Sequence, residues 1–169
     1  TNQHKYTYMY HLRTQYKKEI EMLAKASVRL ADRGYVSSQG GNLSHRAGED
    51  IILITPTKVP KEKIRSEDIV IINLEGDVLY APKGRKPTGE APFHIHIFRK
   101  RPDLKALVHA HPPEITALAI AHNDLLSRPL LPEPIIEVGP VLNVEYKEPL
   151  SDDLARAFDP VIMRTNAFL

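Results

Sequence analysis

The segment that most restricts the fold is a short apolar run that ends in two histidines and two prolines. Ala106-Leu107-Val108 leads into His109-Ala110-His111, and Pro112-Pro113 follows directly. The run predicts a strand, and the prolines predict its abrupt end. Residues i and i+2 of a strand point to the same face, so both imidazoles can bind one metal ion. Two solvent-facing histidines are the structural alternative, but α/β proteins bind ligands at the carboxyl ends of strands, which favours a site.

Apolar spacing predicts the other elements. Over residues 13–33 apolar side chains recur at helical spacing, and Gly34 stands where a helix C-cap is expected. The aromatic and polar residues before this helix predict an N-terminal arm over residues 1–12, and Glu75-Gly76 indicates a hairpin turn. We expect further helices from about residue 88, over 113–121 and over 152–158 with Ser151 as N-cap, and strands over 51–54, 68–74, 78–80, 135–138 and 161–163.

Composition limits the kinds of site and partner. The chain has 169 residues and no cysteine, so a metal ion must be held by histidine and oxygen ligands. With 23 basic and 21 acidic side chains the charge is nearly balanced, and no nucleic-acid-binding face is predicted. No apolar segment approaches the roughly 20 residues that span a membrane, and the polar first residues do not resemble a signal peptide. These features predict a soluble, cytoplasmic protein.

Four motifs in order resemble those of one protein family. Gly40-Gly41-Asn42-Leu43-Ser44 is followed by Leu53-Ile54-Thr55-Pro56-Thr57, then by Gly89-Glu90 with His94, then by Val108-His109-Ala110-His111. In order and interval they are similar to the signatures of the class II aldolase/adducin family. With the expected elements, the resemblance implies an α/β domain over residues 13–169, a three-layer α/β/α sandwich with a central, largely antiparallel sheet. It also implies a homotetramer with the active site near a subunit interface.

The resemblance implies a divalent metal ion, with Zn²⁺ the expected ion, held by His109 and His111. Catalytic zinc normally takes three protein ligands and keeps one position open. In the family the third histidine comes from a late strand, but here the matching position holds Asn166. Because the chain stops inside an apolar run that predicts a strand, we expect the natural protein to continue past Leu169.

Glu90 is the general acid/base that the resemblance implies. Its position at a helix start lowers the carboxyl pKa through the helix dipole, whereas burial beside Phe93 raises it. The sequence leaves open which effect is larger. His94 lies four residues later on the same helix face, so it can hydrogen-bond the Glu90 carboxylate, and we interpret it as a supporting residue.

A phosphate pocket is the second site that the resemblance implies. The residues that match its positions are Gly41, Asn42, Thr57, Thr88 and Gly89. Lys58 stands where a glycine is usual, and it either adds a cation for the phosphate or fills the pocket. Thr88-Gly89 stands where the sugar-phosphate enzyme has two serines. The structural alternative for Gly40-Gly41-Asn42 is a tight turn, although its backbone N–H groups can also approach an anion.

The leading hypothesis is a metal-dependent lyase that cleaves a C–C bond in a small, phosphorylated hydroxy-keto compound, of the class II aldolase type. The metal would stabilise an enediolate, and Glu90 would move the proton on its carbon. A related decarboxylase or dehydratase is the chemical alternative. A non-catalytic, adducin-like binding module is the alternative from another class, favoured by Asn166, whereas Glu90 and the histidine pair favour the enzyme. The expected partner is a sugar phosphate, with no membrane partner.

Overall fold

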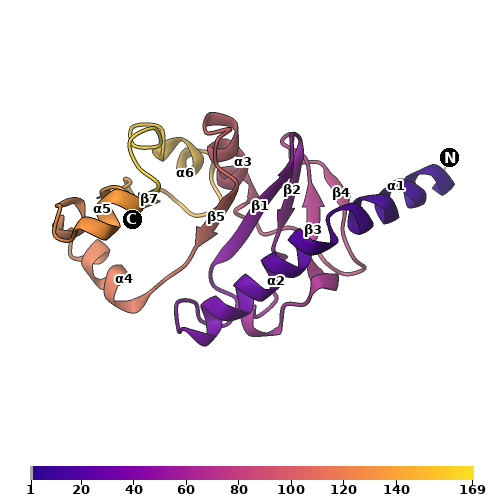
Figure 1. Ribbon diagram of the computed structural model, residues 1–169, viewed down its shortest axis with the longest axis horizontal. Coiled ribbons are helices and arrows are strands. Elements are labelled where there is room, and N and C mark those ends of the chain that lie inside the picture. The colour runs from indigo at the N-terminus through magenta and orange to yellow at the C-terminus, as the bar shows by residue number, and fades with distance from the viewer. Residues whose placement is uncertain (1) are drawn as a thin grey trace.

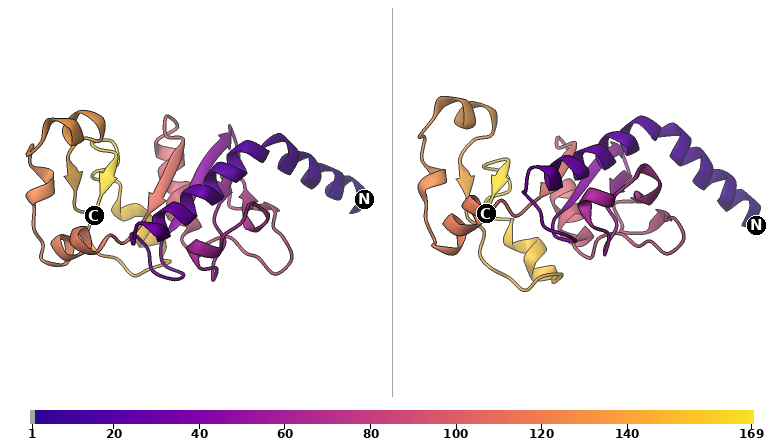
Figure 2. Two further views of the ribbon diagram at one scale, coloured as in Figure 1. Left: turned by 60° about the horizontal axis from the view of Figure 1, so that its bottom comes forward. Right: turned by 90° about the horizontal axis from the view of Figure 1, so that it is seen from below.

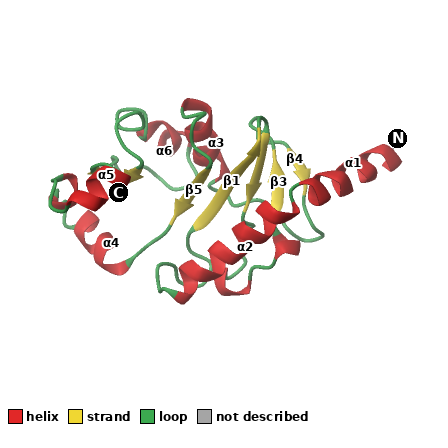
Figure 3. Ribbon diagram, in the orientation of Figure 1, coloured by secondary structure: helices red, strands yellow, loops and turns green. Residues whose placement is uncertain are grey.

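A five-stranded antiparallel sheet forms the centre of the protein (Figures 1 and 3). The structure is a computed structural model that describes residues 2–169, with side chains from residue 7 onwards. The strands lie in the order β4-β3-β2-β1-β5, and every neighbouring pair is antiparallel. They are β1 (Asn42–Gly48), β2 (Ile51–Ile54), β3 (Val70–Ile72), β4 (Val78–Tyr80) and β5 (Ala106–His109).

Helices and one small parallel pair of strands surround this sheet. The α-helices are α1 (Asn2–Gln15), α2 (Lys17–Asp32), α3 (Ala91–Lys100), α4 (Pro113–Ile120), α5 (Pro132–Glu137) and α6 (Asp152–Ala157). The 3₁₀ turns are η1 (Lys61–Lys63), η2 (Ser66–Asp68) and η3 (Leu125–Ser127), and the small pair is β6 (Val141–Leu142) with β7 (Ala167–Phe168). Within residues 2–169 no helix is long and apolar enough to cross a bilayer.

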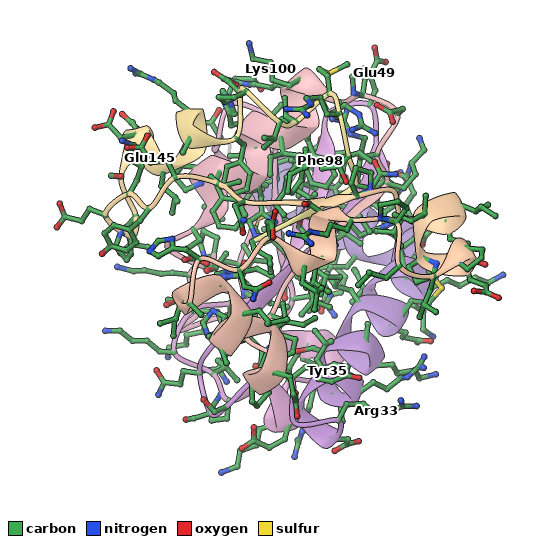
Figure 4. The ribbon with its side chains drawn as sticks, turned by 90° about the vertical axis from the view of Figure 1, so that its left-hand side faces the viewer. Arg33, Tyr35, Glu49, Phe98, Lys100 and Glu145 are labelled. Carbon is green, nitrogen blue, oxygen red and sulfur yellow. The ribbon has the colours of Figure 1, made fainter. Side chains whose placement is uncertain are left out.

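Helices cover both faces of the central sheet. On one face the apolar side of α2 packs against β1, β2 and β3, at Leu43, Leu53 and Ile71. On the other face α3 packs against the alternate residues of β2 and β3, and Phe98 is completely buried there. Figure 4 shows Phe98 inside the molecule and Lys100 at its edge. Because strand side chains alternate between faces, one sheet serves two helix layers, and the predicted α/β/α sandwich is confirmed.

The N-terminal helix begins earlier than predicted and is divided in two. α1 and α2 meet at Tyr16, whose φ of −104° and ψ of 24° interrupt the regular helix. Figure 2 shows α1 pointing away from the sheet. The predicted start at residue 13 is wrong, because neither glycine nor proline stands before it to stop the helix. Gly34, with φ +71°, follows α2 as predicted. An arm over 1–12 and a domain over 13–169 stay a prediction.

The structure contains strand β1, which was not predicted from the sequence. Asn42 and Ser44 are buried, and Ser44 lies opposite both Ile54 of β2 and Leu107 of β5. Residues directly opposite in a sheet share a face, so Ser44 and Asn42 face α3. Buried polar residues on this face hide the strand from a search for apolar alternation.

Two predicted strands near the C-terminus are wrong. Residues 132–137 form α5, with Pro132 at a position that suits the first helical turn. Residues 161–163 form a turn in which the N–H groups of Val161 and Ile162 both donate to the Phe158 carbonyl. Ile162 then packs against α3 and α6. Short β-branched runs suit either conformation, and here tertiary packing decides.

Other predicted elements agree with the structure. β2, the hairpin from β3 to β4, and α4 are present. The Ser151 hydroxyl caps α6 by accepting from the Leu154 N–H at 3.1 Å, as its position as N-cap predicts. β3 is shorter than predicted, because residues 66–68 form η2. α3 begins at Ala91, three residues after the predicted start.

Candidate active site

Three segments that are distant in sequence meet on the α3 side of the sheet. β1 pairs with β5 so that Asn42 lies opposite His109. Glu90 is the residue directly before α3, which packs over this face. The start of α3 therefore brings the Glu90 carboxylate to the carboxyl end of β5, where the sequence predicts a site.

Glu90, His109 and His111 form one connected group. Glu90 Oε2 lies 2.6 Å from His109 Nδ1, and His109 Nε2 lies 3.1 Å from His111 Nε2. His111 follows the end of β5, and its backbone N–H donates to the Tyr35 carbonyl at 2.7 Å. The Glu90 and His109 side chains are 18% and 32% exposed, so a small molecule can reach them. The structure thus brings together the three residues that the sequence predicts for catalysis and metal binding.

The surroundings of Glu90 favour its ionised form. Burial raises the Glu90 pKa, but hydrogen bonds from His109 and Asn42, with the charges of His109 and His94, outweigh burial and lower it from 4.5 to about 2. Burial lowers the pKa of His111, and the His109 charge lowers it further against the opposing effect of Glu90. A neutral imidazole has the lone pair that a metal ligand needs. Hydrogen bonding therefore decides the question that the sequence leaves open at Glu90.

His94 is connected to Glu90 through Asn42 rather than directly. Asn42 Nδ2 donates to Glu90 Oε2 at 2.6 Å, and Asn42 Oδ1 lies 2.5 Å from His94 Nε2. The other His94 nitrogen, Nδ1, lies 2.7 Å from Ser44 Oγ. A direct bond between His94 and Glu90 is therefore wrong. The roles of Asn42 and Ser44 in this network were not predicted from the sequence. Their i, i+2 spacing, which matches that of His109 and His111, is the signal that could have indicated two polar side chains on one face of a strand.

Apart from Asn42, which begins β1, the predicted phosphate residues lie in loops. An antiparallel bridge between Pro56 and Pro87 joins the loop after β2 to the loop before α3. Across it, the Thr88 N–H donates to the Thr55 carbonyl at 3.1 Å, and the Thr57 N–H is bonded at 3.0 Å. These N–H groups are already used, so Thr57 and Thr88 can offer an anion their hydroxyl groups.

Gly41 and Lys58 have backbone reasons for their positions. Gly41 has φ +68°, and a Cβ there would lie 2.5 Å from Val36 Cγ1 and 2.6 Å from the His109 carbonyl oxygen. Packing alone therefore requires glycine at 41. Lys58 has φ +58°, in the left-handed region that favours glycine, which explains why glycine is usual there. The Lys58 side chain is exposed, as is Gly89.

The two histidines fit a metal ion, although the described residues contain no group of three His, Cys, Asp or Glu side chains arranged to hold one. His109 turns Nδ1 to Glu90 and Nε2 to His111, so the pair offers two Nε2 atoms. Their separation of 3.1 Å is close to the ~3.3 Å between two nitrogens of a tetrahedral site with Zn–N bonds of about 2.05 Å. A carboxylate that accepts from the other ring nitrogen is the usual way to orient a metal-binding histidine.

Asn166 does not join this group. Its Oδ1 accepts from Arg101 Nη2 at 2.9 Å, and Arg101 directly follows α3. Glu90 directly precedes the same helix, whose ten residues rise by roughly 15 Å. The residue at the expected third-ligand position is therefore held at the opposite end of α3.

Comparison with known proteins decides the family. A family model described as the class II aldolase and adducin N-terminal domain matches residues 21–169. The chain belongs to this family. The resemblance that the four motifs predict is confirmed, and class II aldolases as a group depend on a metal ion.

The relatives of this protein within the class II aldolase family have names that specify different substrates. The 3-oxo-tetronate 4-phosphate decarboxylase of Haemophilus influenzae is 30% identical over 152 residues, which cover 88% of this chain and 71% of the relative. The L-fuculose phosphate aldolase of Methanocaldococcus jannaschii is 34% identical over 142 residues, covering 82% and 75%. The crystal structure of YgbL from Escherichia coli is 26% identical with a TM-score of 0.82, covering 90% and 73%.

Proposed function

We propose that the protein is a metal-dependent carbon–carbon lyase that acts on a small, phosphorylated hydroxy-keto compound through an enediolate. The contact between Glu90 Oε2 and His109 Nδ1 at 2.6 Å, with His111 on the far side of the same ring, carries this proposal. It places a carboxylate base next to a pair of metal ligands. An adducin-like binding module has no need of such an arrangement.

His109 and His111 would hold the metal ion, which we take to be Zn²⁺, through their Nε2 atoms. When bound, the ion would act as a Lewis acid that stabilises negative charge on the substrate oxygens. Glu90 supports this role by accepting from His109 Nδ1, because the bond leaves Nε2 as the unprotonated nitrogen. The tetramer implied by the family resemblance is part of the proposal, and sedimentation measures it.

Glu90 would remove or return the proton on the carbon next to the carbonyl. Its Oε2 accepts from Asn42 and His109, whereas Oε1 accepts no hydrogen bond from the residues that the structure describes. Oε1 is therefore the oxygen available to a substrate. The low pKa keeps Glu90 ionised at neutral pH, so it enters the reaction as a base.

The substrate phosphate would bind where the loops containing Gly41, Thr57 and Thr88-Gly89 meet. The bridge between Pro56 and Pro87 supports a single pocket there, and the hydroxyls of Thr57 and Thr88 are hydrogen-bond donors suited to an anion. Lys58 adds a positive charge at the rim. The Asn42 amide is already occupied by Glu90 and His94, so we assign Asn42 to the base rather than to the phosphate.

Decarboxylation is a second candidate, favoured by the relative from Haemophilus influenzae that is 30% identical. Loss of CO₂ from a 3-oxo acid and retro-aldol cleavage both leave an electron pair on the carbon next to a carbonyl. The same metal ion and the same phosphate pocket serve both reactions. What differs is the leaving group, which is CO₂ in one case and an aldehyde in the other.

Substrate comparison and one variant test the proposal together. The metal-loaded protein is incubated with 3-oxo-tetronate 4-phosphate and with L-fuculose 1-phosphate, and CO₂ and aldehyde release are measured. For the reactive substrate, we expect Glu90→Gln to lower turnover by about 100-fold or more, because general acid–base catalysis typically contributes that much. Bound metal should be unchanged. Full turnover in Glu90→Gln would remove Glu90 from the mechanism, and inactivity of the wild-type protein on every such phosphate would favour the binding module.

A further inference from the structure

Two buried residues are connected to the proposed base by hydrogen bonds that, within the described part of the chain, involve neither His109 nor His111. Ser44 and His94 are both 0% exposed. His94 lies 2.7 Å from Ser44 and 2.5 Å from Asn42, and Asn42 lies 2.6 Å from Glu90. The proposed function uses the Glu90 end of this chain and leaves Ser44 and His94 without a role.

The donors and acceptors along the chain can be arranged in one way only. An ionised Glu90 can only accept, so Asn42 must present its NH₂ group to Oε2 and its carbonyl oxygen to His94. His94 Nε2 must then carry a proton and donate. Burial lowers the His94 pKa to about 3, the His109 charge adds to this, and Glu90 opposes it, so the ring is neutral at neutral pH. Neutral His94 accepts at Nδ1, and the Ser44 hydroxyl donates to it.

We infer that Ser44 and His94 are positioning residues, which hold the Asn42 amide in the one orientation that donates to Glu90. Every hydrogen along the chain from Ser44 points toward the Glu90 carboxylate. If the amide turned over, its oxygen would face the Glu90 oxygen, and two acceptors at 2.6 Å repel each other. Glu90 would then move away from the position it needs for proton transfer. The inference rests on the proposed role of Glu90 as acid/base.

A simpler structural role for Ser44 and His94 makes a different forecast. If Ser44 and His94 only fill space in the core, altering His94 lowers the stability of the protein to a similar extent whichever ring nitrogen is lost. The positioning role depends on one nitrogen, Nε2, which faces Asn42. Variants that replace one ring nitrogen with an amide at the same place and leave the other without a substitute therefore distinguish the positioning role from the structural role.

His94→Gln and His94→Asn form the matched pair. The longer Gln side chain places its amide near the Nε2 position and keeps a donor for Asn42. The shorter Asn side chain places its amide near the Nδ1 position, so it keeps a partner for Ser44 and leaves Asn42 without a donor. Both are neutral amides, and neither alters the Glu90, His109 or His111 side chain.

Steady-state kinetics and metal content of the loaded protein provide the first test. We expect His94→Asn to lower kcat by roughly 10–100-fold with KM and bound metal unchanged, because a catalytic group misplaced by about an ångström can lose up to 100-fold. His94→Gln should stay within about threefold of the wild type. Equal losses of kcat in the two variants, or no loss in either, would overturn the inference.

A nitrogen-detected NMR spectrum of the wild-type protein provides the second test and needs neither substrate nor a variant. We expect the His94 ring in the Nε2–H form at neutral pH and the Asn42 side-chain amide protected from exchange with solvent. A ring in the Nδ1–H form would refute the inference even if His94→Asn failed to fold. If no substrate is turned over while the expected spectrum is found, the proposed function fails and the orientation of Asn42 stands.

Discussion

His109 uses its two ring nitrogens for two different purposes. Nδ1 faces Glu90 at 2.6 Å and Nε2 faces His111 at 3.1 Å. Removal of His109 would therefore disturb both the carboxylate and the proposed pair of metal ligands. His111 is the cleaner residue to alter, because it lies after the end of β5 and its side chain is bonded within the described residues to His109 alone.

At the residue scale we predict that His111→Ala loses tightly bound metal and remains folded. One imidazole cannot hold the ion that two hold, whereas the exposed His111 ring contributes little to the core. Metal content after dialysis and circular dichroism measure the two outcomes. His11→Ala, at an exposed position of α1, is the control and should keep its metal. Stoichiometric metal in His111→Ala would show that the histidine pair is not the site.

At the scale of elements, the site depends on how the loop before β1 passes β5. A Cβ at Gly41 would lie against both Val36 and the His109 carbonyl oxygen, so the lack of a side chain lets the loop come close to the strand that carries His109. Lys61, 1% exposed, holds the same loop by donating to the Gln39 carbonyl at 3.1 Å and to the Val59 carbonyl at 3.2 Å. The loop is thus anchored from within the protein before any ligand binds.

We predict that Gly41→Ala destabilises the protein by about 1–3 kcal/mol more than Gly34→Ala does, the range usual for forcing an extra methyl group into packed surroundings. Gly41 and Gly34 have nearly equal φ, +68° and +71°, so both variants place an alanine at a positive φ. A Cβ at Gly34 meets nothing within 4 Å, whereas at Gly41 it meets atoms at 2.5 and 2.6 Å. Urea unfolding of both variants measures the difference. Equal free energies of unfolding would show that the loop yields to the methyl group.

At the scale of the whole molecule, the buried polar network makes stability depend on pH. His94 has a pKa of about 3 in the folded protein and about 6.5 when unfolded, so between these values the unfolded state binds a proton that the folded state does not. Its contribution to stability is present above pH 6.5 and is lost as the pH falls toward 3. Glu90, lowered from 4.5 to about 2, adds a further loss between those values.

We therefore predict that the free energy of unfolding of the metal-free protein falls as the pH is lowered from 6.5 to 4.5. The part due to His94 is about 2–3 kcal/mol, at 1.36 kcal/mol per pH unit. Urea unfolding at several pH values measures the fall, and His94→Gln should reduce it by that amount. His111, whose pKa is also lowered, leaves a residual slope in the variant. An unchanged pH dependence in His94→Gln would mean that His94 is protonated in the folded protein.

The family, the sandwich fold and the meeting of Glu90 with the histidine pair followed from the sequence, because motif order and apolar runs are local properties. Strand β1 and the true partners of His94 did not follow. Asn42 and Ser44 look like loop residues until pairing with β2 and β5 turns them toward α3. The strands expected over 135–138 and 161–163 failed for the same reason, since short apolar runs take the conformation that their neighbours impose.

The sequence by itself determined which chemical groups are present: a carboxylate, two imidazoles two residues apart, and a glycine-rich turn. Only the tertiary structure decided how they are connected. The pairing of Asn42 with His109 and the packing of α3 over both place an amide between His94 and Glu90. A hydrogen bond from Arg101, which follows the far end of α3, holds Asn166 away from the histidines. A hydrogen bond requires its donor and acceptor to be placed to within a few tenths of an ångström. For residues far apart in the chain, that placement exists only once the sheet and its helices have packed.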